Sequence, residues 1–259
     1  MWKKNTTFAV EIVYKLMDRQ ENIDFCIRYL LEQDNAEARI PSKLRDKKEQ
    51  LRALMNIWRP QPLSDEFLAA QDAELQAQLR DKGVVRTRER VWQGDITRLN
   101  VDAIVNAANS RGLGCWHPLH ACIDNAIHSA AGLQLRQECN KILQGEEIAT
   151  GGAIITPGYN LPAKYVIHTV GPIIPNGIPT AGQEEQLACC YRTCLYMARE
   201  QGCRSIAFCC ISTGEFRFPN RRAAEIAIEA CKDARIRVVF NVFKDIDYDI
   251  YSELLSKHK

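Results

Sequence analysis

The chain has 259 residues, of which 46% are apolar and 25% charged, and this balance excludes a disordered or collagen-like chain. A formal net charge of +2 offers no basic field for nucleic acid or an anionic membrane, so neither is expected as a partner. No run of 18 apolar residues occurs, and Glu11, Lys15, Asp18 and Arg19 interrupt any N-terminal apolar segment. We therefore expect a cytoplasmic protein. Eleven cysteines, an odd number, favour reduced thiols or a metal site over a disulfide framework.

The first 80 residues predict helices. Apolar residues recur at helical spacing over 8–31 and 41–58, and Pro60 and Pro62 end the second segment. A third helix is predicted over 64–79, with Ser64 at its start. A boundary near 81–83 then divides the chain into a helical N-terminal extension, 1–84, and a second domain, 85–259.

The second domain predicts an α/β fold of three layers, because short β-rich runs alternate with helical stretches and several runs are apolar throughout. Strands are predicted over 89–93, 102–107, 152–156, 164–169, 204–211 and 236–243. Helices are predicted over 119–131, 133–143, 183–201, 219–234 and 246–257.

Ligands of such folds bind at the carboxyl ends of strands, and three loops there carry suitable residues. The carboxylate of Asp95 could accept from an exocyclic amine, or simply cap a turn. Asn106 and Asn109 offer amides to hydroxyl groups, or form an Asx-turn. A glycine-containing loop before a helix suits a diphosphate, or is an ordinary loop; its residues are Ser212, Thr213, Gly214, Glu215 and Phe216.

The most specific pattern is Cys115-x4-His120-x-Cys122. Two thiolates and an imidazole suit Zn²⁺, and three protein ligands leave a fourth position open, as in catalytic sites. His117 as a fourth ligand would make the site structural, although Pro118 favours an extended turn that points it away. The alternative without a metal is that two buried cysteines lie near an unrelated histidine. Asp124, two residues later, could orient a ribose hydroxyl or activate water, or be a surface residue of a helix's first turn.

Two further histidines are expected to be structural. His128 falls on the helix after Asp124 and is expected to pack or hydrogen-bond locally. His168 lies in a predicted strand, where a histidine of the core with satisfied hydrogen bonds is the favoured interpretation.

In their order, these motifs resemble the macrodomain family. The resemblance covers about residues 86–259. It rests on the segments GDIT (94–97), DAIVNAANS (102–110), IDNAIH (123–128), TGGA (150–153), TPGYNL (156–161), VIHTVGP (166–172) and ISTGEF (211–216).

One departure from the family is informative. A glycine run that most macrodomains carry before the IDNAIH-like segment is replaced here by Cys115, His120 and Cys122. This resembles the zinc-dependent, microbial protein-ADP-ribose hydrolases, which also carry a helical N-terminal extension. The resemblance implies a three-layer α/β/α macrodomain with a mixed sheet, and an association with a sirtuin-type transferase and lipoylated carrier proteins.

The same resemblance implies the roles of individual residues. Asp95 would bind the adenine amine, and Ile96 would contact adenine through its backbone. Asn106 and Asn109 would face the distal ribose, and residues 212–216 would wrap the diphosphate. Zinc would be held by the Cys-His-Cys set, and Asp124 would be the acidic catalytic residue. Phe243 would pack against adenine.

The sequence thus predicts a zinc-dependent hydrolase that removes mono-ADP-ribose from Asp or Glu side chains of a modified protein. One alternative is a reader module that binds ADP-ribose without turnover. Another is a hydrolase of a small ester such as O-acetyl-ADP-ribose. The N-terminal helices either cover and stabilise the second domain or help to recognise the modified protein, and their balanced charge favours the first role.

Overall fold

The computed structural model describes residues 18–37 and 39–257. The described part begins with three helices, α2 (Arg19–Gln33), α3 (Leu44–Ile57) and α4 (Asp65–Lys82). The apolar pattern predicted over 8–17 lies outside the described residues. The Ser64 hydroxyl accepts the Phe67 N–H at the start of α4, as its sequence predicts. Gly83 ends this helix with φ of +76°, a conformation that glycine adopts without strain.

The rest of the chain alternates strands and helices around one mixed sheet. The order in the sheet is β1-β6-β5-β2-β4-β3, and every neighbouring pair is parallel except β3 with β4. The predicted α/β fold with a mixed sheet is therefore confirmed. Its elements are β1 (Val91–Gln93), the short 3-10 helix η1 (Ile96–Arg98), β2 (Ala103–Ala107), α5 (Ile123–Ala131), α6 (Leu133–Leu143), β3 (Ala153–Pro157), β4 (Tyr165–Thr169), α7 (Ala181–Glu200), β5 (Ser205–Phe208), α8 (Asn220–Cys231), β6 (Arg237–Val242) and α9 (Asp245–Ser256).

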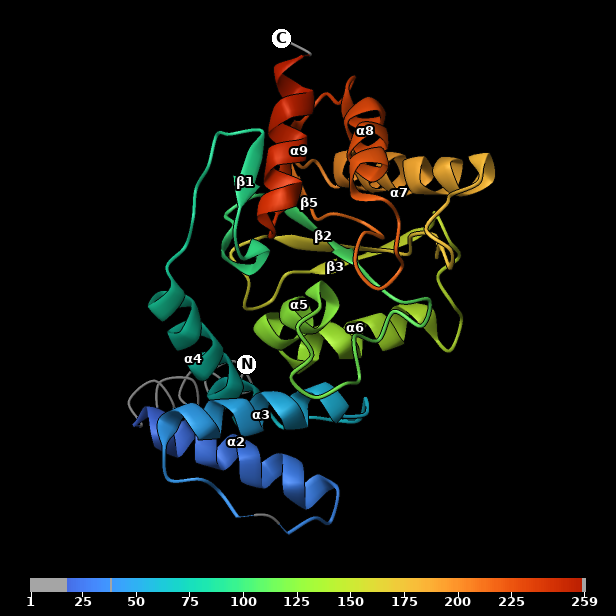
Figure 1. The fold of residues 1–259 in the computed structure, drawn as a ribbon. Coiled ribbons are helices and arrows are strands. Elements are labelled where there is room, and N and C mark those ends of the chain that lie inside the picture. The colour runs from blue at the N-terminus through green and yellow to red at the C-terminus, as the bar shows by residue number, and fades with distance from the viewer. Residues whose placement is uncertain (1–17, 38, 258–259) are drawn as a thin grey trace.

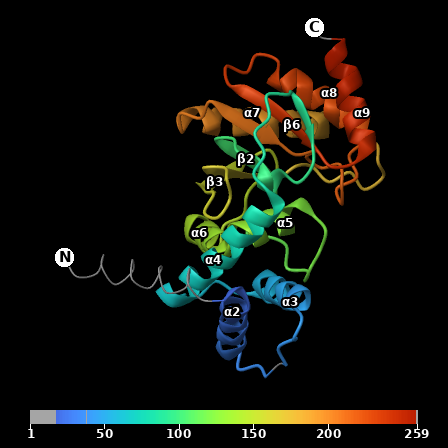
Figure 2. The same ribbon diagram turned by 90° about the vertical axis from the view of Figure 1, so that its left-hand side faces the viewer.

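Helices cover the sheet on both faces. Helices α7, α8 and α9 lie on one face, and α5 and α6 lie on the other (Figures 1 and 2). The strands between them are apolar because both of their faces are buried; Ile104, Val105, Val166 and Ile206 are all inaccessible to solvent. This arrangement leaves the loops at the carboxyl ends of β1, β6, β5 and β2 along one edge of the sheet.

The N-terminal helices form a further layer beyond α5 and α6 (Figure 1). They have a hydrophobic cluster of their own, in which Ile23, Ile27, Leu51 and Phe67 are almost fully buried. Leu133 of α6 belongs to the same cluster. Burial of each such side chain contributes about 1.5–3 kcal/mol, so this cluster stabilises the three helices against one another and, through Leu133, against α6.

Two predicted boundaries are wrong in ways that matter for the site. The helix predicted over 119–131 begins at Ile123, because Cys122 caps it and Leu119 has a φ of +58° that no α-helix accepts. The strand predicted over 204–211 ends at Phe208, and the chain then turns toward Ser212, whose φ is +65°. Among the described helices, none is long and apolar enough to cross a membrane.

Candidate functional site

A buried carboxylate, Asp124, lies at the end of β2. It sits on the first turn of α5 with 5% of its surface exposed. The Asn106 amide, in β2, donates to one carboxylate oxygen at 2.7 Å, and the Asn109 amide donates to the other at 3.3 Å. The structure thus brings together three residues that the sequence placed in one site, and it holds Asp124 through both of its oxygens.

Burial raises the pKa of Asp124 to about 6, against the opposing effects of the Asn106 hydrogen bond, the Arg136 charge and the Asn109 hydrogen bond. A carboxyl group with a pKa near neutrality exchanges its proton readily under mild conditions. The surroundings of Asp124 therefore suit acid–base chemistry better than those of an exposed surface carboxylate.

The Asn106 amide is oriented from behind by His168. Its nitrogen also donates to His168 Nδ1 at 3.1 Å, and His168 Nε2 lies 3.0 Å from the Thr156 hydroxyl. His168 is fully buried, which confirms its interpretation as a core histidine with satisfied hydrogen bonds. With its nitrogen used twice, Asn106 is left with a buried Oδ1 atom that has no hydrogen-bond partner among the described residues.

His128 packs beside this network, as expected. It is 5% exposed, and its Nε2 lies 3.5 Å from Asp124 Oδ1. Burial lowers the pKa of His128 well below its usual value, so the ring is neutral at physiological pH. His128 therefore adds no positive charge beside Asp124.

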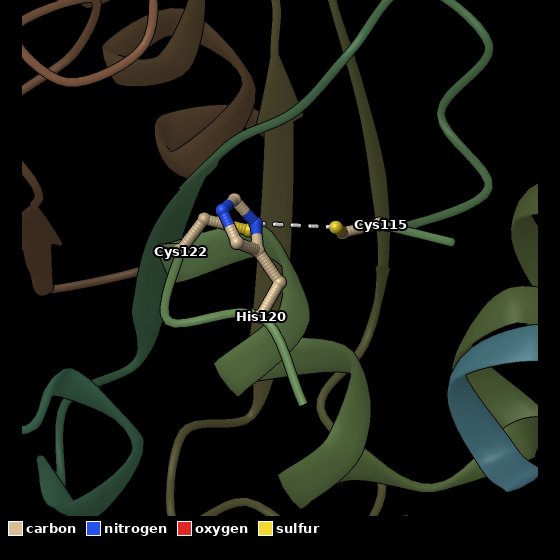
Figure 3. Close-up of side chains that lie close together, drawn as sticks. All are labelled: Cys115, His120 and Cys122. Carbon is tan, nitrogen blue, oxygen red and sulfur yellow. Dashed lines mark hydrogen bonds between the residues drawn. The ribbon is translucent and has the colours of Figure 1, made fainter. Parts of the chain in front are cut away.

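Cys115, His120 and Cys122 converge just before α5. Their ligand atoms lie within 4.8 Å of one another, and Cys115 Sγ is 3.5 Å from His120 Nδ1 (Figure 3). Cys122 is the N-cap of α5, and its sulfur accepts the Asn125 N–H at 3.4 Å. A thiolate at this position benefits from the partial positive charge of the helix start.

The chemistry of this group fits a zinc ion. Burial, and then the neighbouring Cys115 thiolate, raise the pKa of the Cys122 thiol to about 12, so two thiolates this close need a cation to coexist. His117 is exposed, its ring centroid is 5.9 Å from that of His120, and it does not belong to the group. The residues present thus offer three ligands, which is the number found in catalytic zinc sites.

A second group of metal-type ligands, His128, Cys139 and His168, lies in the core. His168 Nε2 is already within hydrogen-bond distance of Thr156. Burial raises the pKa of the Cys139 thiol to about 12, so it stays protonated. We interpret this group as part of the support behind Asn106.

The loop after β5, which the sequence offers as a candidate diphosphate loop, has a tightly hydrogen-bonded backbone. The Phe218 N–H donates to the Ser212 carbonyl at 2.9 Å, and the Ile174 N–H donates to the Phe216 carbonyl at 2.8 Å. The buried Ser212 hydroxyl has no hydrogen-bond partner within residues 18–37 and 39–257. Gly214 and Glu215 are exposed, and Thr213 and Phe216 are partly exposed. The loop therefore exposes Gly214 and Glu215 at the same edge of the sheet as Asp124, while the Ser212 hydroxyl lies buried beneath it.

Asp95 lies after β1, at the far end of this edge. One oxygen of its carboxylate accepts from the Thr97 N–H and hydroxyl at 3.0 and 2.6 Å, and the other pairs with Lys82 at 3.1 Å. The capping role weighed in the sequence is thus present. Ile96 is buried. Phe243, which was expected to pack against adenine, is 77% exposed.

Two residues of α3, Arg52 and Asn56, contact the loop of residues 115–122 that carries the metal ligands, and the sequence analysis did not identify them. Arg52 donates to the His120 carbonyl at 3.2 Å, and Asn56 accepts the Leu119 N–H at 3.0 Å. Pairings across more than 60 residues leave no periodic signal in a single sequence, so nothing in the pattern pointed to them.

The sequence profile of the Macro domain family matches residues 105–227. The protein-ADP-ribose hydrolase of Treponema medium is 48% identical over 262 residues, which span 93% of this chain and all of that protein.

Among solved structures, the Oceanobacillus iheyensis macrodomain with ADP is 40% identical with a TM-score of 0.58, over 65% of this chain and 90% of that one. The Trypanosoma brucei macrodomain in complex with ADP-ribose is 30% identical with a TM-score of 0.58, over 79% and 94% of the two chains. The site described above thus lies in a fold that holds these nucleotides in its relatives.

Proposed function

This chain belongs to the macrodomain family that includes the protein-ADP-ribose hydrolases, and from that premise we propose a zinc-dependent hydrolase of acid-linked mono-ADP-ribose. The substrate is a protein that carries ADP-ribose on an Asp or Glu side chain. One observation carries the proposal: Cys122, a ligand of the metal group, caps the same helix whose first turn carries the buried Asp124.

The proximity of the two features argues against a module that only binds. A reader needs a pocket for ADP-ribose, but it needs neither a three-ligand metal group nor a buried carboxylate with a pKa near 6. The buried carboxylate costs stability, because its charged form is removed from water, and two thiolates this close would repel each other without a cation. Such arrangements are typical of sites that perform chemistry.

In the proposed reaction, water cleaves the ribosyl ester, and the products are ADP-ribose and the free carboxyl group of the protein. Zinc held by Cys115, His120 and Cys122 would supply Lewis-acid assistance to an oxygen of substrate or water. Asp124 orients a hydroxyl of the distal ribose or takes the proton of the attacking water. Asn106 and Asn109 hold the carboxylate still, which keeps its remaining lone pairs directed at the reacting atoms.

The remaining predicted residues bind the nucleotide in this proposal. Asp95 receives the adenine amine, with Ile96 beside it. The backbone of residues 212–216 receives the diphosphate, for which loop N–H groups are suited. The Asn106 Oδ1 atom accepts from the substrate and the Ser212 hydroxyl donates to it; both are buried and lack a hydrogen-bond partner in the part of the chain that the structure describes.

A turnover assay tests the proposal. The purified protein is incubated with a mono-ADP-ribosylated protein of known acidic linkage, and release of ADP-ribose is measured. Cys115→Ala and Asp124→Ala should each lose about 100-fold or more in rate. The matched control Cys189→Ala, on α7 across the sheet, should keep the wild-type rate.

Other outcomes identify the alternatives. Tight binding of ADP-ribose without turnover in any form would leave a reader. Cleavage of O-acetyl-ADP-ribose but not of the modified protein would leave a hydrolase of small esters. As the modified protein we propose a lipoylated carrier protein modified by a sirtuin-type transferase, and comparison of its turnover with that of an unrelated acid-linked protein tests this choice.

A further inference from the structure

We propose that helix α3 is a positioning element of the metal site, through Arg52 and Asn56. This inference rests on the proposed zinc site and assigns the N-terminal extension a role beyond stability or recognition of the modified protein. The two side chains hold the backbone before Cys122 in the form that brings His120 to the two cysteines.

The backbone of this loop needs support from outside. Leu119 has a φ of +58°, in the left-handed region that a leucine rarely adopts, and its side chain is 43% exposed. Such a conformation persists only where the surroundings enforce it. Because Leu119 directly precedes His120, a change in its backbone would carry the imidazole away from Cys115.

Asn56 supplies support at this residue. Its Oδ1 accepts the Leu119 N–H at 3.0 Å, and its Nδ2 donates to the Ser129 hydroxyl of α5 at 2.9 Å. The side chain is 1% exposed, so these bonds are shielded from water. Asn56 thereby fixes the loop relative to both α3 and α5.

Arg52 supports the next part of the loop. Its guanidinium donates to the His120 carbonyl at 3.2 Å and to Asn125 Oδ1 at 2.6 Å. Asn125 in turn donates to the His117 carbonyl at 3.0 Å, and its backbone N–H contacts Cys122 Sγ. Arg52 therefore acts on His120 directly and on the Cys122 side through Asn125.

The Cys115 side of the loop is attached to the same helix. The Arg136 guanidinium lies 4.4 Å from the Trp116 ring centroid, next in sequence to Cys115. The same guanidinium donates to the Asn56 and Trp58 carbonyls at the end of α3, at 2.9 and 2.6 Å. Both ends of the loop are thus held by contacts that lead to α3. The geometry of the three ligands therefore depends on this helix.

The test measures metal binding rather than activity. The zinc dissociation constants of the full-length wild type, Arg52→Met and Asn56→Leu are determined by competition with a chromophoric chelator. The visible spectra of their Co²⁺ forms report ligand geometry. The matched control is Arg45→Met, on the same helix, whose side chain is 84% exposed and, within the described residues, pairs only with Glu49. Thermal unfolding of each metal-free protein shows whether the fold is intact.

We expect Arg52→Met and Asn56→Leu to weaken zinc binding by about 10-fold or more and to shift the Co²⁺ bands. Arg45→Met should stay within about twofold of the wild type, since exposed pairs contribute little. Wild-type affinity and an unchanged Co²⁺ spectrum in Arg52→Met would overturn the inference. So would an equal loss in Arg45→Met. If Arg52→Met does not fold, Asn56→Leu decides alone by the same criteria. A wild type that binds no zinc would instead overturn the proposed function.

Discussion

The buried His168 predicts an acid-sensitive fold. Burial lowers the pKa of His168 to about 3, whereas an unfolded histidine has a pKa near 6.5. Between about pH 6.5 and pH 3, His168 is therefore protonated in the unfolded chain but neutral in the folded chain. Acid thus favours unfolding, and the free energy of unfolding falls by up to about 1.4 kcal/mol per pH unit from this group. Relative to pH 8, the loss amounts to about 2 kcal/mol at pH 5.

Urea unfolding of the metal-free wild type and His168→Asn at pH 8 and pH 5 measures this effect. The variant keeps an acceptor for Asn106 but loses the bond to Thr156, so we expect it to be less stable at pH 8 by about 2 kcal/mol or more. At pH 5 the gap should shrink by about 2 kcal/mol, because only the wild type carries the titrating ring. A gap that stays constant between the two pH values would refute the assignment of a buried, neutral His168.

Two further predictions concern glycine and the nucleotide. Gly114→Ala should lower the free energy of unfolding by at least about 2 kcal/mol, because a Cβ at φ of +81° would lie 2.8 Å from the His128 ring. The control Gly177→Ala, at φ of +70° with nothing within 4 Å of its Cβ, should lower it by about 1 kcal/mol. Equal losses of the two variants in urea unfolding would contradict this expectation. Asp95→Asn should keep its cap on the turn but lower ADP-ribose affinity about 10-fold in calorimetry, and unchanged affinity would remove Asp95 from the adenine site.

Local patterns in the sequence predicted much of the fold. Alternating apolar strands and helices predicted the α/β sheet, and the Ser64 cap is where its sequence places it. The helix predicted from 119 begins only at Ile123 in the structure. Leu119 has a left-handed backbone that leucine does not favour by itself, and its N–H is bound by Asn56 of α3. Propensity cannot foresee such a tertiary constraint.

The site was predictable to the extent that its residues are close in sequence. Cys115, His120 and Cys122 fall within eight residues, and their convergence needs only one loop. The support of that loop by Arg52 and Asn56 depends on how α3 packs on α5, which no local pattern specifies. The contact of His168 with Asn106 was not predictable from local sequence either, because it depends on the pairing of β2 with β4.

Zinc titration of the metal-free enzyme tests whether hydrolysis depends on a metal held by Cys115, His120 and Cys122. Zinc is removed with a chelator, returned in measured amounts, and turnover of the acid-linked ADP-ribosylated protein is recorded at each step. We expect negligible turnover without metal and a linear rise that ends at one zinc per chain, with no recovery in Cys115→Ala. Full turnover in the metal-free protein, or zinc binding that leaves the rate unchanged, would contradict it.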